Sequence, residues 1–156
     1  MLPVANRPML EHLLCAVRDA GITDFIFVVG YEEAAVRRYF GDGSGFGVQI
    51  RYVTQKRQRG TGDAVMSARP HIHGPFLLMN GDMILSLHDI RGVLQVQAPA
   101  MGVCPSDHPQ DFGVVTVVDG KVTGLEEKTD HPMSNLINAG IYLFTPELFS
   151  SLETIV

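Results

Sequence analysis

Phe76-Leu77-Leu78-Met79-Asn80-Gly81-Asp82 is the stretch from which the fold of this chain can be argued. Its four leading apolar residues follow Gly74-Pro75 and read as a short strand that is buried on both faces. The apolar run stops at Asn80-Gly81, and a carboxylate comes next. Open α/β sheets bind ligands outside the carboxyl ends of their strands, so Asp82 is well placed to hold a divalent cation. The alternative is a simple turn, because all three of these residues are turn formers.

Outward from this strand, helical and strand patterns alternate through the first half of the chain. The expected helices cover residues 9–20, 32–40, 63–68, 87–96 and a last one from 146, and the expected strands cover 25–29, 48–53, 76–79, 100–103, 113–118, 122–127 and 137–144. Alternation predicts βαβ units and a parallel sheet, whereas the strand-rich second half predicts antiparallel pairing. Asp119-Gly120 predicts a hairpin turn. No repeat or linker divides the pattern, so a single domain over residues 1–156 is expected.

Bulk composition narrows the classes of function. The 156 residues are 46% hydrophobic and 19% charged, which is typical of a globular core. The net charge of −5 contains no block of like charge, so neither nucleic acid nor a membrane is expected as a partner. Cys15 and Cys104 lie far apart among apolar residues, which predicts buried free thiols and a reducing, cytoplasmic setting.

A second informative stretch runs from Gln55 to Asp63, Gln-Lys-Arg-Gln-Arg-Gly-Thr-Gly-Asp. Gln55 stands at the carboxyl end of an expected strand, and its amide offers a donor and an acceptor together, which suits the edge of a nucleobase. Gly60-Thr61-Gly62 opens an expected helix whose backbone amides can hold a base carbonyl or an anion. The competing interpretation is an ordinary glycine-rich loop before a capped helix, because the pattern matches neither the phosphate loop nor the dinucleotide fingerprint.

The second half carries a third set of polar residues on or beside expected strands. Carboxylates such as Glu126 and Glu127 can accept hydrogen bonds from sugar hydroxyls, and the ammonium of Lys128 can meet a phosphate. The alternative is a solvated, charged strand end. Asn138 lies inside an apolar strand, either as a satisfied core amide or as a ligand contact. Gly113 marks either a bend or a close approach of the backbone to a ligand.

Taken together, these motifs resemble the sugar-1-phosphate nucleotidylyltransferases in their order and approximate spacing. The segments that carry the resemblance are Met1–Leu10, Gly41–Ser44, Gln55 with Gly60–Ala64, Asn80–Asp82, Phe112–Val114, Glu126–Lys128 and Asn138–Tyr142. The Gly-Thr-Gly-Asp-Ala block is most similar to that of archaeal and bacterial uridylyl- and thymidylyltransferases acting on glucose 1-phosphate or N-acetylglucosamine 1-phosphate. The resemblance spans essentially the whole chain and implies a Rossmann-like α/β fold with a mixed sheet of the GT-A-like type.

The resemblance implies a magnesium-dependent reaction between UTP or dTTP and a sugar 1-phosphate. A sugar phosphate oxygen would attack the α-phosphorus of the nucleotide, and pyrophosphate would leave. The residues implied to bind the nucleotide are Gln55, Gly60, Thr61, Gly81 and Asp82. Among these, Gln55 and Gly60 would read the pyrimidine, and Asp82 would bind Mg²⁺ and lie near the ribose.

The same resemblance implies a sugar-phosphate site in the second half. Gly113, Asn138 and one of the two glutamates, Glu126 or Glu127, would hold the sugar. Lys128 would face the sugar phosphate and, with Asp82, is implied as a catalytic residue. Neighbours on a strand face opposite sides, so we expect only one glutamate to point at the ligand and Glu126 to share a face with Lys128.

Two parts of the family pattern are not matched. A first strand with a Gly-x-Gly-Thr-Arg loop around the triphosphate would precede Met1, and a second metal-binding aspartate would follow Val156. That first strand is normally central, next to the strand that carries Asp82. We therefore expect a partial domain lacking the usual first central strand, with two exposed strand edges and weak or no activity. We also expect another copy, in a homo-oligomer, or a rearranged segment to fill the gap.

Two alternative functions stay open at this point. One is a non-catalytic module that binds a nucleotide or a sugar, and the other is an inactive fragment that is stable only as an oligomer. Uracil and thymine present the same edge to a glutamine and a backbone amide, so the sequence does not choose between UTP and dTTP. Nor does it choose between glucose 1-phosphate and its N-acetylamino counterpart.

Overall fold

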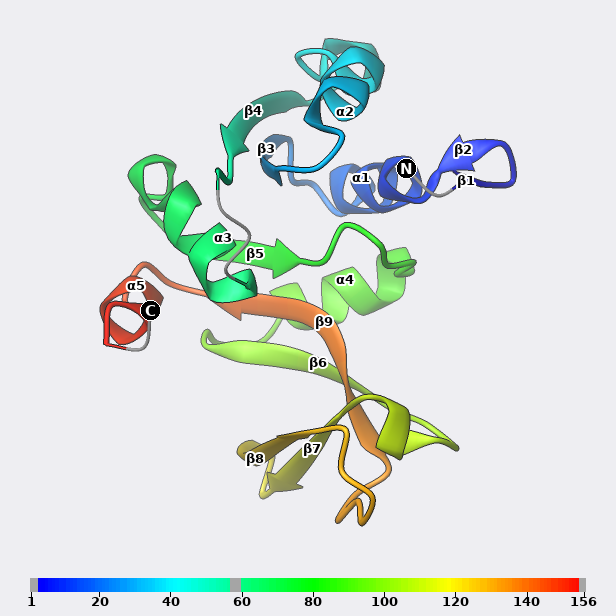
Figure 1. The fold of residues 1–156 in the computed structure, drawn as a ribbon, viewed down its shortest axis with the longest axis vertical. Helices are drawn as coiled ribbons and strands as arrows, with labels where there is room; N and C mark the ends of the chain where they lie inside the picture. Colours follow the sequence, from blue (N-terminus) through cyan, green and yellow to red (C-terminus); the bar gives the residue numbers. More distant parts are fainter. Residues whose placement is uncertain (1–2, 57–59, 155–156) are drawn as a thin grey trace.

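The computed structural model describes residues 3–56 and 60–154, and it places the strands in separate sheets (Figure 1). The strands are β1 (Pro3–Val4), β2 (Arg7–Pro8), β3 (Asp24–Val29), β4 (Gln49–Thr54), β5 (Phe76–Met79), β6 (Ala100–Pro105), β7 (Gly113–Val118), β8 (Lys121–Glu127) and β9 (Leu136–Phe144). The helices are α1 (Met9–Asp19), α2 (Glu33–Phe40), α3 (Thr61–Ala68), α4 (Leu87–Leu94) and α5 (Leu148–Leu152), with 3₁₀ turns η1 (Ser44–Phe46), η2 (Arg69–His71) and η3 (Pro109–Asp111).

The mixed α/β architecture expected from the sequence is confirmed. β3 and β4 form a parallel pair joined through α2, as the βαβ pattern predicts. The second half is antiparallel, in the order β5-β9-β7-β8 with β6 also paired to β9. β9 curves through this sheet and pairs with β6 along nearly its whole length (Figure 1). Its other edge pairs with β5 near the end of β9 and with β7 near the start. Asp119 and Gly120 both have positive φ and make the expected tight turn between β7 and β8.

α1 lies between two groups of buried side chains and so ties the two sheets together. The first group joins α1 to α4 and β9 and consists of Leu13, Val17, Ile90 and Ile141. The second group joins α1 to α2 and the β4 region and consists of Leu14, Phe40, Val48 and Ile50. Burial of each such side chain contributes roughly 1.5–3 kcal/mol, so both faces of α1 contribute to stability.

The beginning of the described chain differs from the extended segment that the sequence predicts. β1 and β2 pair as a hairpin, and the Nε2 atom of His12 lies 2.9 Å from the carbonyl oxygen of Val4, which attaches the hairpin to α1. Glu11 is buried, accepts a hydrogen bond from the Tyr39 hydroxyl on α2 and lies 3.5 Å from Arg7. The hydrogen bond to Glu11 raises the pKa of Tyr39. These contacts replace water around an otherwise isolated carboxylate.

A cavity of about 910 Å³ separates β3 from β5, and we call it the interstrand cavity. Every residue of β3 and of β5 lines it, so the two sheets face one another across a gap. The sequence predicts that these strands are buried, but within β3 only Val29 is, and all four residues of β5 are half-exposed. The prediction of full burial is wrong because each strand has a neighbour on one edge only. The expected pair of exposed strand edges is confirmed, and no described segment fills the gap.

Smaller differences concern helix ends and cysteines. α3 begins at Thr61, two residues before the predicted start, because Gly60, with φ of 98°, takes the position before the first turn. Cys15 and Cys104 are free thiols as expected, but they are half-buried rather than buried. Within residues 3–56 and 60–154, no helix has the length and apolarity needed to span a membrane.

Candidate functional site

The carboxyl ends of β3 and β5 meet the start of α3 around the interstrand cavity. Gly30 follows β3, Gly81 follows β5, and Thr61 opens α3, and all three line the cavity. The structure therefore brings together Thr61 and Gly81, two residues predicted to bind a nucleotide. A crevice at the carboxyl ends of strands is where open α/β sheets bind ligands.

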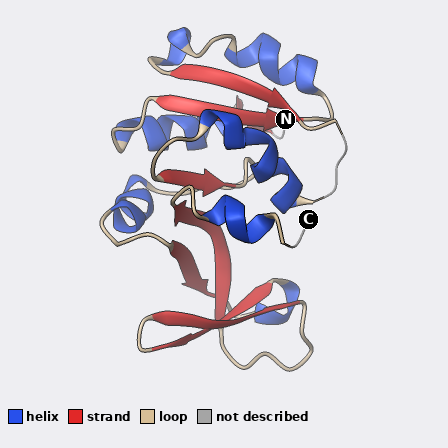
Figure 2. Cartoon of the chain, turned by 90° about the vertical axis from the view of Figure 1, so that its left-hand side faces the viewer, coloured by secondary structure: helices blue, strands red, loops and turns tan. Residues whose placement is uncertain are grey.

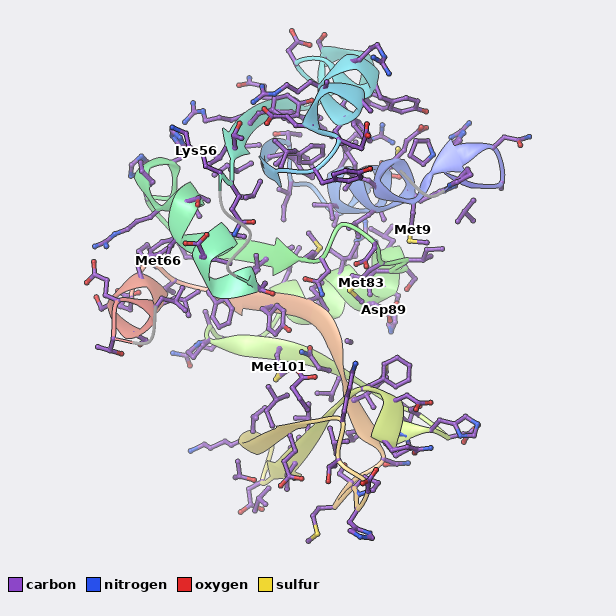
Figure 3. The ribbon with its side chains drawn as sticks, in the orientation of Figure 1. Met9, Lys56, Met66, Met83, Asp89 and Met101 are labelled. Atoms are coloured by element: carbon purple, nitrogen blue, oxygen red, sulfur yellow. The ribbon has the colours of Figure 1, made fainter. Side chains whose placement is uncertain are left out.

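Gln55 is held in a defined orientation at the end of β4. Its backbone N–H donates to the carbonyl of Val29 at 2.7 Å, which extends the β3–β4 pairing by one residue. Its side-chain Nε2 donates to Asp63 Oδ2 at 2.8 Å and to the carbonyl of Gly60 at 3.3 Å. The predicted pair Gln55 and Gly60 is thus in direct contact, and the amide oxygen is the group left to meet a base. Lys56 lies on the segment that leaves β4 (Figure 3).

Asp63 is a site residue that the sequence reasoning missed. It lies in the first turn of α3, where a carboxylate is also favoured by the positive end of the helix dipole. Its contact with Gln55 makes it a positioning residue for the amide. The available signal was an acidic residue three positions after the glycine that precedes the helix. In the part of the chain that the structure describes, no side chain caps α3, so backbone N–H groups of its first turn remain for a ligand.

A neighbouring pair of contacts braces the end of β4 against α2. Glu33 accepts hydrogen bonds from Thr54 Oγ1 at 2.8 Å and from Arg37 Nε at 2.6 Å. The Thr54 hydroxyl, followed by the Arg37 guanidinium, lowers the pKa of Glu33. The same guanidinium lies 4.5 Å from the centre of the Tyr52 ring, a distance suited to a cation–π contact. The hydroxyl of Thr54, bound to Glu33, therefore holds the residue before Gln55 in place.

Asp82 is exposed in the turn that follows β5, and its neighbours are held against Gly140 of β9. The N–H of Asn80 donates to the carbonyl of Gly140 at 3.3 Å. A β-carbon on Gly140 would collide with the sulfur of Met83, which lies just after Asp82 (Figure 3). Gly140 also has a φ of 66°, a conformation that glycine adopts without strain. Gly140 was missed by the sequence reasoning, although a glycine inside an apolar strand signals a close approach.

Three residues predicted to hold the sugar share one face of the second sheet. Gly113 and Glu127 are direct partners across the β7–β8 ladder. Val114 pairs with Ile137 between β7 and β9, so Asn138 occupies the register position next to Gly113. Directly opposed residues in antiparallel strands point to the same side of a sheet. The structure therefore brings together Gly113, Glu127 and Asn138, although the sequence separates Gly113 and Asn138 by a hairpin and a long loop.

The register also places the two glutamates on opposite faces of the sheet. Glu126 is opposite Val114, so it points away from the face that holds Gly113 and Glu127. Lys128 lies beyond the end of β8 with a φ of 49°, and its N–H donates to the carbonyl of Phe112 at 3.2 Å. The expectation that Glu126 and Lys128 share a face of the strand is not met. β8 ends at Glu127, and the alternation of side chains stops there. A lysine with positive φ is strained backbone, a feature found often at functional sites.

The side chain of Asn138 is already engaged within β9. Its Nδ2 donates to the Tyr142 hydroxyl at 2.6 Å, and its Oδ1 accepts the N–H of Gly140 at 2.9 Å. Asn138 is thus a satisfied amide with one N–H and one lone pair to spare for a ligand. Because Gly140 also accepts from Asn80, a path of hydrogen bonds runs from Asn138 to the turn that carries Asp82. Among residues 3–56 and 60–154, no hydrogen bond or ion pair joins Asn138 or the turn that carries Asp82 to Gln55 or Gly60.

The exposed carboxylate of Asp82 fits a metal ion whose other ligands are substrate phosphates and waters. Among the described residues, no three His, Cys, Asp or Glu side chains cluster at metal-binding distances. Mg²⁺ is usually bound by one or two carboxylates together with substrate phosphates and waters, rather than by a cage of protein ligands. A single exposed carboxylate at Asp82 therefore fits Mg²⁺ carried by a nucleoside triphosphate. It does not fit a site closed by protein groups alone.

Comparison with known proteins gives a consistent result. Residues 1–155 match the family model described as nucleotidyl transferase. The chain is 36% identical over 159 residues to the bifunctional protein GlmU of Methanococcus maripaludis, covering 100% of this chain and 37% of that protein. It is 36% identical over 162 residues to a glucose-1-phosphate thymidylyltransferase of Streptomyces antibioticus, covering 99% of this chain and 46% of that protein.

A solved structure shows the same fold. A crystal structure from Bacillus anthracis, described as a proposed glucose-1-phosphate thymidylyltransferase in complex with sucrose, superposes with a TM-score of 0.87 at 29% identity. The match covers 99% of this chain and 65% of that chain. The chain therefore spans less than half the length of the two curated relatives and about two thirds of this solved one.

Proposed function

Because this chain belongs to the nucleotidyl transferase family, we propose that it acts in the transfer of a nucleotidyl group from UTP or dTTP to a sugar 1-phosphate. Glucose 1-phosphate and N-acetylglucosamine 1-phosphate are the proposed acceptors. The observation that carries the proposal is the hydrogen-bond path through Gly140. It joins Asn138, on the proposed sugar face, to the turn that carries Asp82.

In this proposal the nucleotide lies at the carboxyl ends of β4 and β5. The amide of Gln55, oriented by Asp63, and the backbone at Gly60 and Thr61 read the pyrimidine edge, since both uracil and thymine offer a carbonyl beside an N–H. Gly81 allows the ribose to approach the backbone because it carries no side chain. Asp82 would hold Mg²⁺, which when bound neutralises charge on the phosphates.

The sugar 1-phosphate lies against the face formed by Gly113, Glu127 and Asn138. The Glu127 carboxylate accepts hydrogen bonds from sugar hydroxyls, and Lys128 places its ammonium at the phosphate. A phosphate oxygen then forms a bond to the α-phosphorus of the nucleotide as the bond to pyrophosphate breaks. The residues contribute position and charge rather than a covalent intermediate.

We further propose that the 156 residues alone transfer the nucleotidyl group slowly. The interstrand cavity leaves the turn that carries Asp82 supported on one side only, and Asp82 is the single carboxylate proposed as a metal ligand. The second candidate function is a non-catalytic module that binds a nucleotide or a sugar, and it is supported by the hydrogen bonds that orient Gln55 and Asn138 without a metal ion. A homo-oligomer and a cytoplasmic setting stay predictions.

Two measurements on the whole chain test the proposal. Titration calorimetry with UTP, dTTP and each sugar 1-phosphate, in the presence of Mg²⁺, measures binding. A single-turnover assay with radiolabelled nucleotide and excess protein measures formation of nucleotide sugar. We expect micromolar-to-millimolar binding and slow product formation that Asp82→Asn abolishes. Asp119→Asn, in the β7–β8 turn, is the matched control and should behave as the parent chain.

The outcomes separate the candidate functions. Binding without any product supports the non-catalytic module, whereas the absence of binding to all four ligands contradicts both functions. Product formation that survives Asp82→Asn contradicts the role of Asp82. Multiple rapid turnovers would support transfer but contradict the expectation that the 156 residues act slowly.

A further inference from the structure

The proposed sugar face continues onto β6 through one residue to which no role has been given, Val103. Val103 pairs directly with Asn138 across the β6–β9 ladder. Asn138 occupies the position next to Gly113, and Gly113 in turn pairs with Glu127. Because directly opposed residues point to the same side of a sheet, Val103 lies on the same face as the three polar contacts. We call these four residues the sugar row, which has an apolar end at β6 and a carboxylate end at β8.

The β6 end of the sugar row is accessible to a ligand. Val103 is 37% exposed, whereas Val115, two residues after Gly113 on the same face of β7, is fully buried. Figure 2 shows the β7–β8 hairpin as a lobe below the rest of the chain, apart from β3 and β4. None of the four residues of the sugar row lines the interstrand cavity. The row is therefore formed independently of the gap between the two sheets.

The orientation of the Asn138 amide determines what it offers to a ligand. The backbone N–H of Gly140 can only donate, so the atom that it meets at 2.9 Å is Oδ1. Nδ2 then faces the Tyr142 hydroxyl at 2.6 Å, and this contact uses one of its two N–H groups. The second N–H is left to donate to a ligand. A sugar hydroxyl and the carbonyl of an acetamido group both accept such a bond, so Asn138 alone does not separate the two proposed acceptors.

The spacing of the sugar row separates them. Neighbouring strands lie about 4.8 Å apart, so Val103 is about 5 Å from Asn138 and about 14 Å from Glu127. A pyranose ring that lies over Gly113 and donates a hydroxyl to Glu127 has its opposite side at Asn138. A hydroxyl on that side ends there, whereas an acetamido group extends further by a carbonyl and a methyl group. The methyl group then reaches Val103, where an apolar contact removes both from water.

On the premise of the proposed function, we propose that Val103 selects an N-acetylated amino sugar 1-phosphate over glucose 1-phosphate. Asn138 Nδ2 donates to the acetamido carbonyl, and the Val103 side chain packs against the acetyl methyl group. Glucose 1-phosphate keeps a hydrogen bond to Asn138 through a hydroxyl but leaves Val103 in water. An enclosed methyl group changes affinity by about tenfold or more, and we expect about fivefold because Val103 is one wall rather than a closed pocket.

Val118 provides a matched comparison for Val103. β-Branched residues favour strands, so an exposed valine on a strand does not by itself require a ligand. Val118 is also an exposed valine, with an exposed fraction of 54%, but it ends β7 at the opposite end from Gly113. It therefore has the same side chain and no place in the sugar row. A change that affects sugar binding only at Val103 reports the row and not the loss of an exposed valine.

Titration calorimetry on the whole chain tests the proposal with the 1-phosphates of N-acetylglucosamine, N-formylglucosamine and glucose. The N-formyl sugar keeps the amide carbonyl and lacks only the methyl group. The parent chain should bind the N-acetyl sugar about fivefold more tightly than the N-formyl sugar. Val103→Thr replaces one methyl group by a hydroxyl and should reduce this difference below about twofold, without changing the affinity for glucose 1-phosphate. Val118→Thr should bind all three ligands as the parent chain does.

A structural measurement accompanies the affinities. In a chain with labelled valine methyl groups, the acetyl methyl protons should show a nuclear Overhauser effect to a valine that is absent in Val103→Thr and present in Val118→Thr. Equal affinities of the parent chain for the N-acetyl and N-formyl sugars would overturn the proposal, and so would a difference that Val103→Thr leaves unchanged. Both of these outcomes leave the proposed function standing. Absence of binding to all three sugar phosphates would overturn the proposed function together with this role of Val103.

Discussion

Gly113 and Glu127 face each other across the β7–β8 ladder so closely that a β-carbon on Gly113 would lie 3.1 Å from Oε1 of Glu127. We predict that Gly113→Ala displaces this carboxylate and weakens binding of a sugar 1-phosphate about tenfold, the equivalent of roughly 1.4 kcal/mol. Binding of UTP should not change. Titration calorimetry measures both. Gly124→Ala is the control on the same hairpin, since a β-carbon there would meet Thr116 at an ordinary 3.7 Å.

The strand register predicts different roles for the two adjacent glutamates. Glu127→Gln should weaken sugar 1-phosphate binding by about tenfold or more, because hydrogen bonds to a charged acceptor contribute roughly 1.5–3 kcal/mol. Glu126→Gln removes the same charge from the opposite face and should leave the affinity within about twofold, as is usual for exposed charges. Calorimetry on the two variants compares them directly. Equal losses, or a larger loss for Glu126→Gln, would show that the β7–β8 register does not set the ligand face.

The contact between Gln55 and Asp63 predicts an indirect role for Asp63 in nucleotide binding. Asp63→Ala frees the amide of Gln55 and should weaken UTP binding, whereas Asp63→Asn keeps an acceptor oxygen and should recover most of the affinity. A double-mutant cycle with Gln55→Ala should give a coupling free energy of about 0.5–3 kcal/mol, the range for residues in contact. Additive effects of Asp63→Ala and Gln55→Ala would contradict this pairing.

Gly140 combines a left-handed backbone conformation with a tight contact, and two variants separate these effects. Gly140→Ala should lower the free energy of unfolding by about 2 kcal/mol, because a left-handed residue costs roughly 1–2 kcal/mol and the new methyl group meets Met83. Gly120→Ala shares the positive φ but has open space around it, so it should lose less. Urea denaturation measures both, and Met83→Ala added to Gly140→Ala should restore part of the loss.

The start of α4 predicts a dependence of stability on pH. Asp89 accepts hydrogen bonds from the Ser86 hydroxyl at 2.6 Å and the Ser86 N–H at 3.0 Å, while the Ser86 hydroxyl accepts from the Asp89 N–H. The Ser86 hydroxyl, followed by its N–H, lowers the pKa of Asp89 from its ordinary value. The folded pKa is below the unfolded one, so the stabilisation is fully present above the unfolded pKa and disappears as pH falls through the folded pKa.

Urea denaturation of the parent chain and of Asp89→Asn at a series of pH values measures this effect. The difference in free energy of unfolding should be constant near neutral pH and should shrink in the acid range. Ser86→Ala should cost about 1 kcal/mol at neutral pH, as expected for loss of a helix cap. A difference between parent and Asp89→Asn that is independent of pH would contradict the proposed pairing.

Local patterns in the sequence were sufficient for much of this fold. The apolar run before Asn80-Gly81 predicted β5, the alternation of helix and strand predicted the β3–β4 unit, and Asp119-Gly120 predicted a turn, because each signal lies within a few residues. The choice between Glu126 and Glu127 could not be made, since it depends on which residue of β7 each one faces. The burial of β5 was also predicted wrongly. The apolar composition of a strand indicates that it prefers a buried position, but it does not show how many neighbouring strands or helices cover it.

Several residues of the candidate site could be predicted from the sequence, but most of the contacts between them could not. Gln55 and Gly60 were expected to act together, and the structure shows their contact. The roles of Asp63 and Gly140 arise from contacts between elements, and the one at Gly140 joins segments about sixty residues apart in the chain. Spacing along a sequence carries no signal for such a contact.

The position of β9 in the second sheet determines when the other strands of that sheet can pair during synthesis of the chain. β5, β6 and β7 all pair with β9, and Phe76 pairs with Phe144, so β5 waits for a partner synthesised almost seventy residues later. The β3–β4 unit and the β7–β8 hairpin are complete earlier, because their partners are nearer in the chain. Until β9 has left the ribosome, the apolar segment before Asp82 has no ladder to join, and the nascent chain exposes it to chaperones and to aggregation.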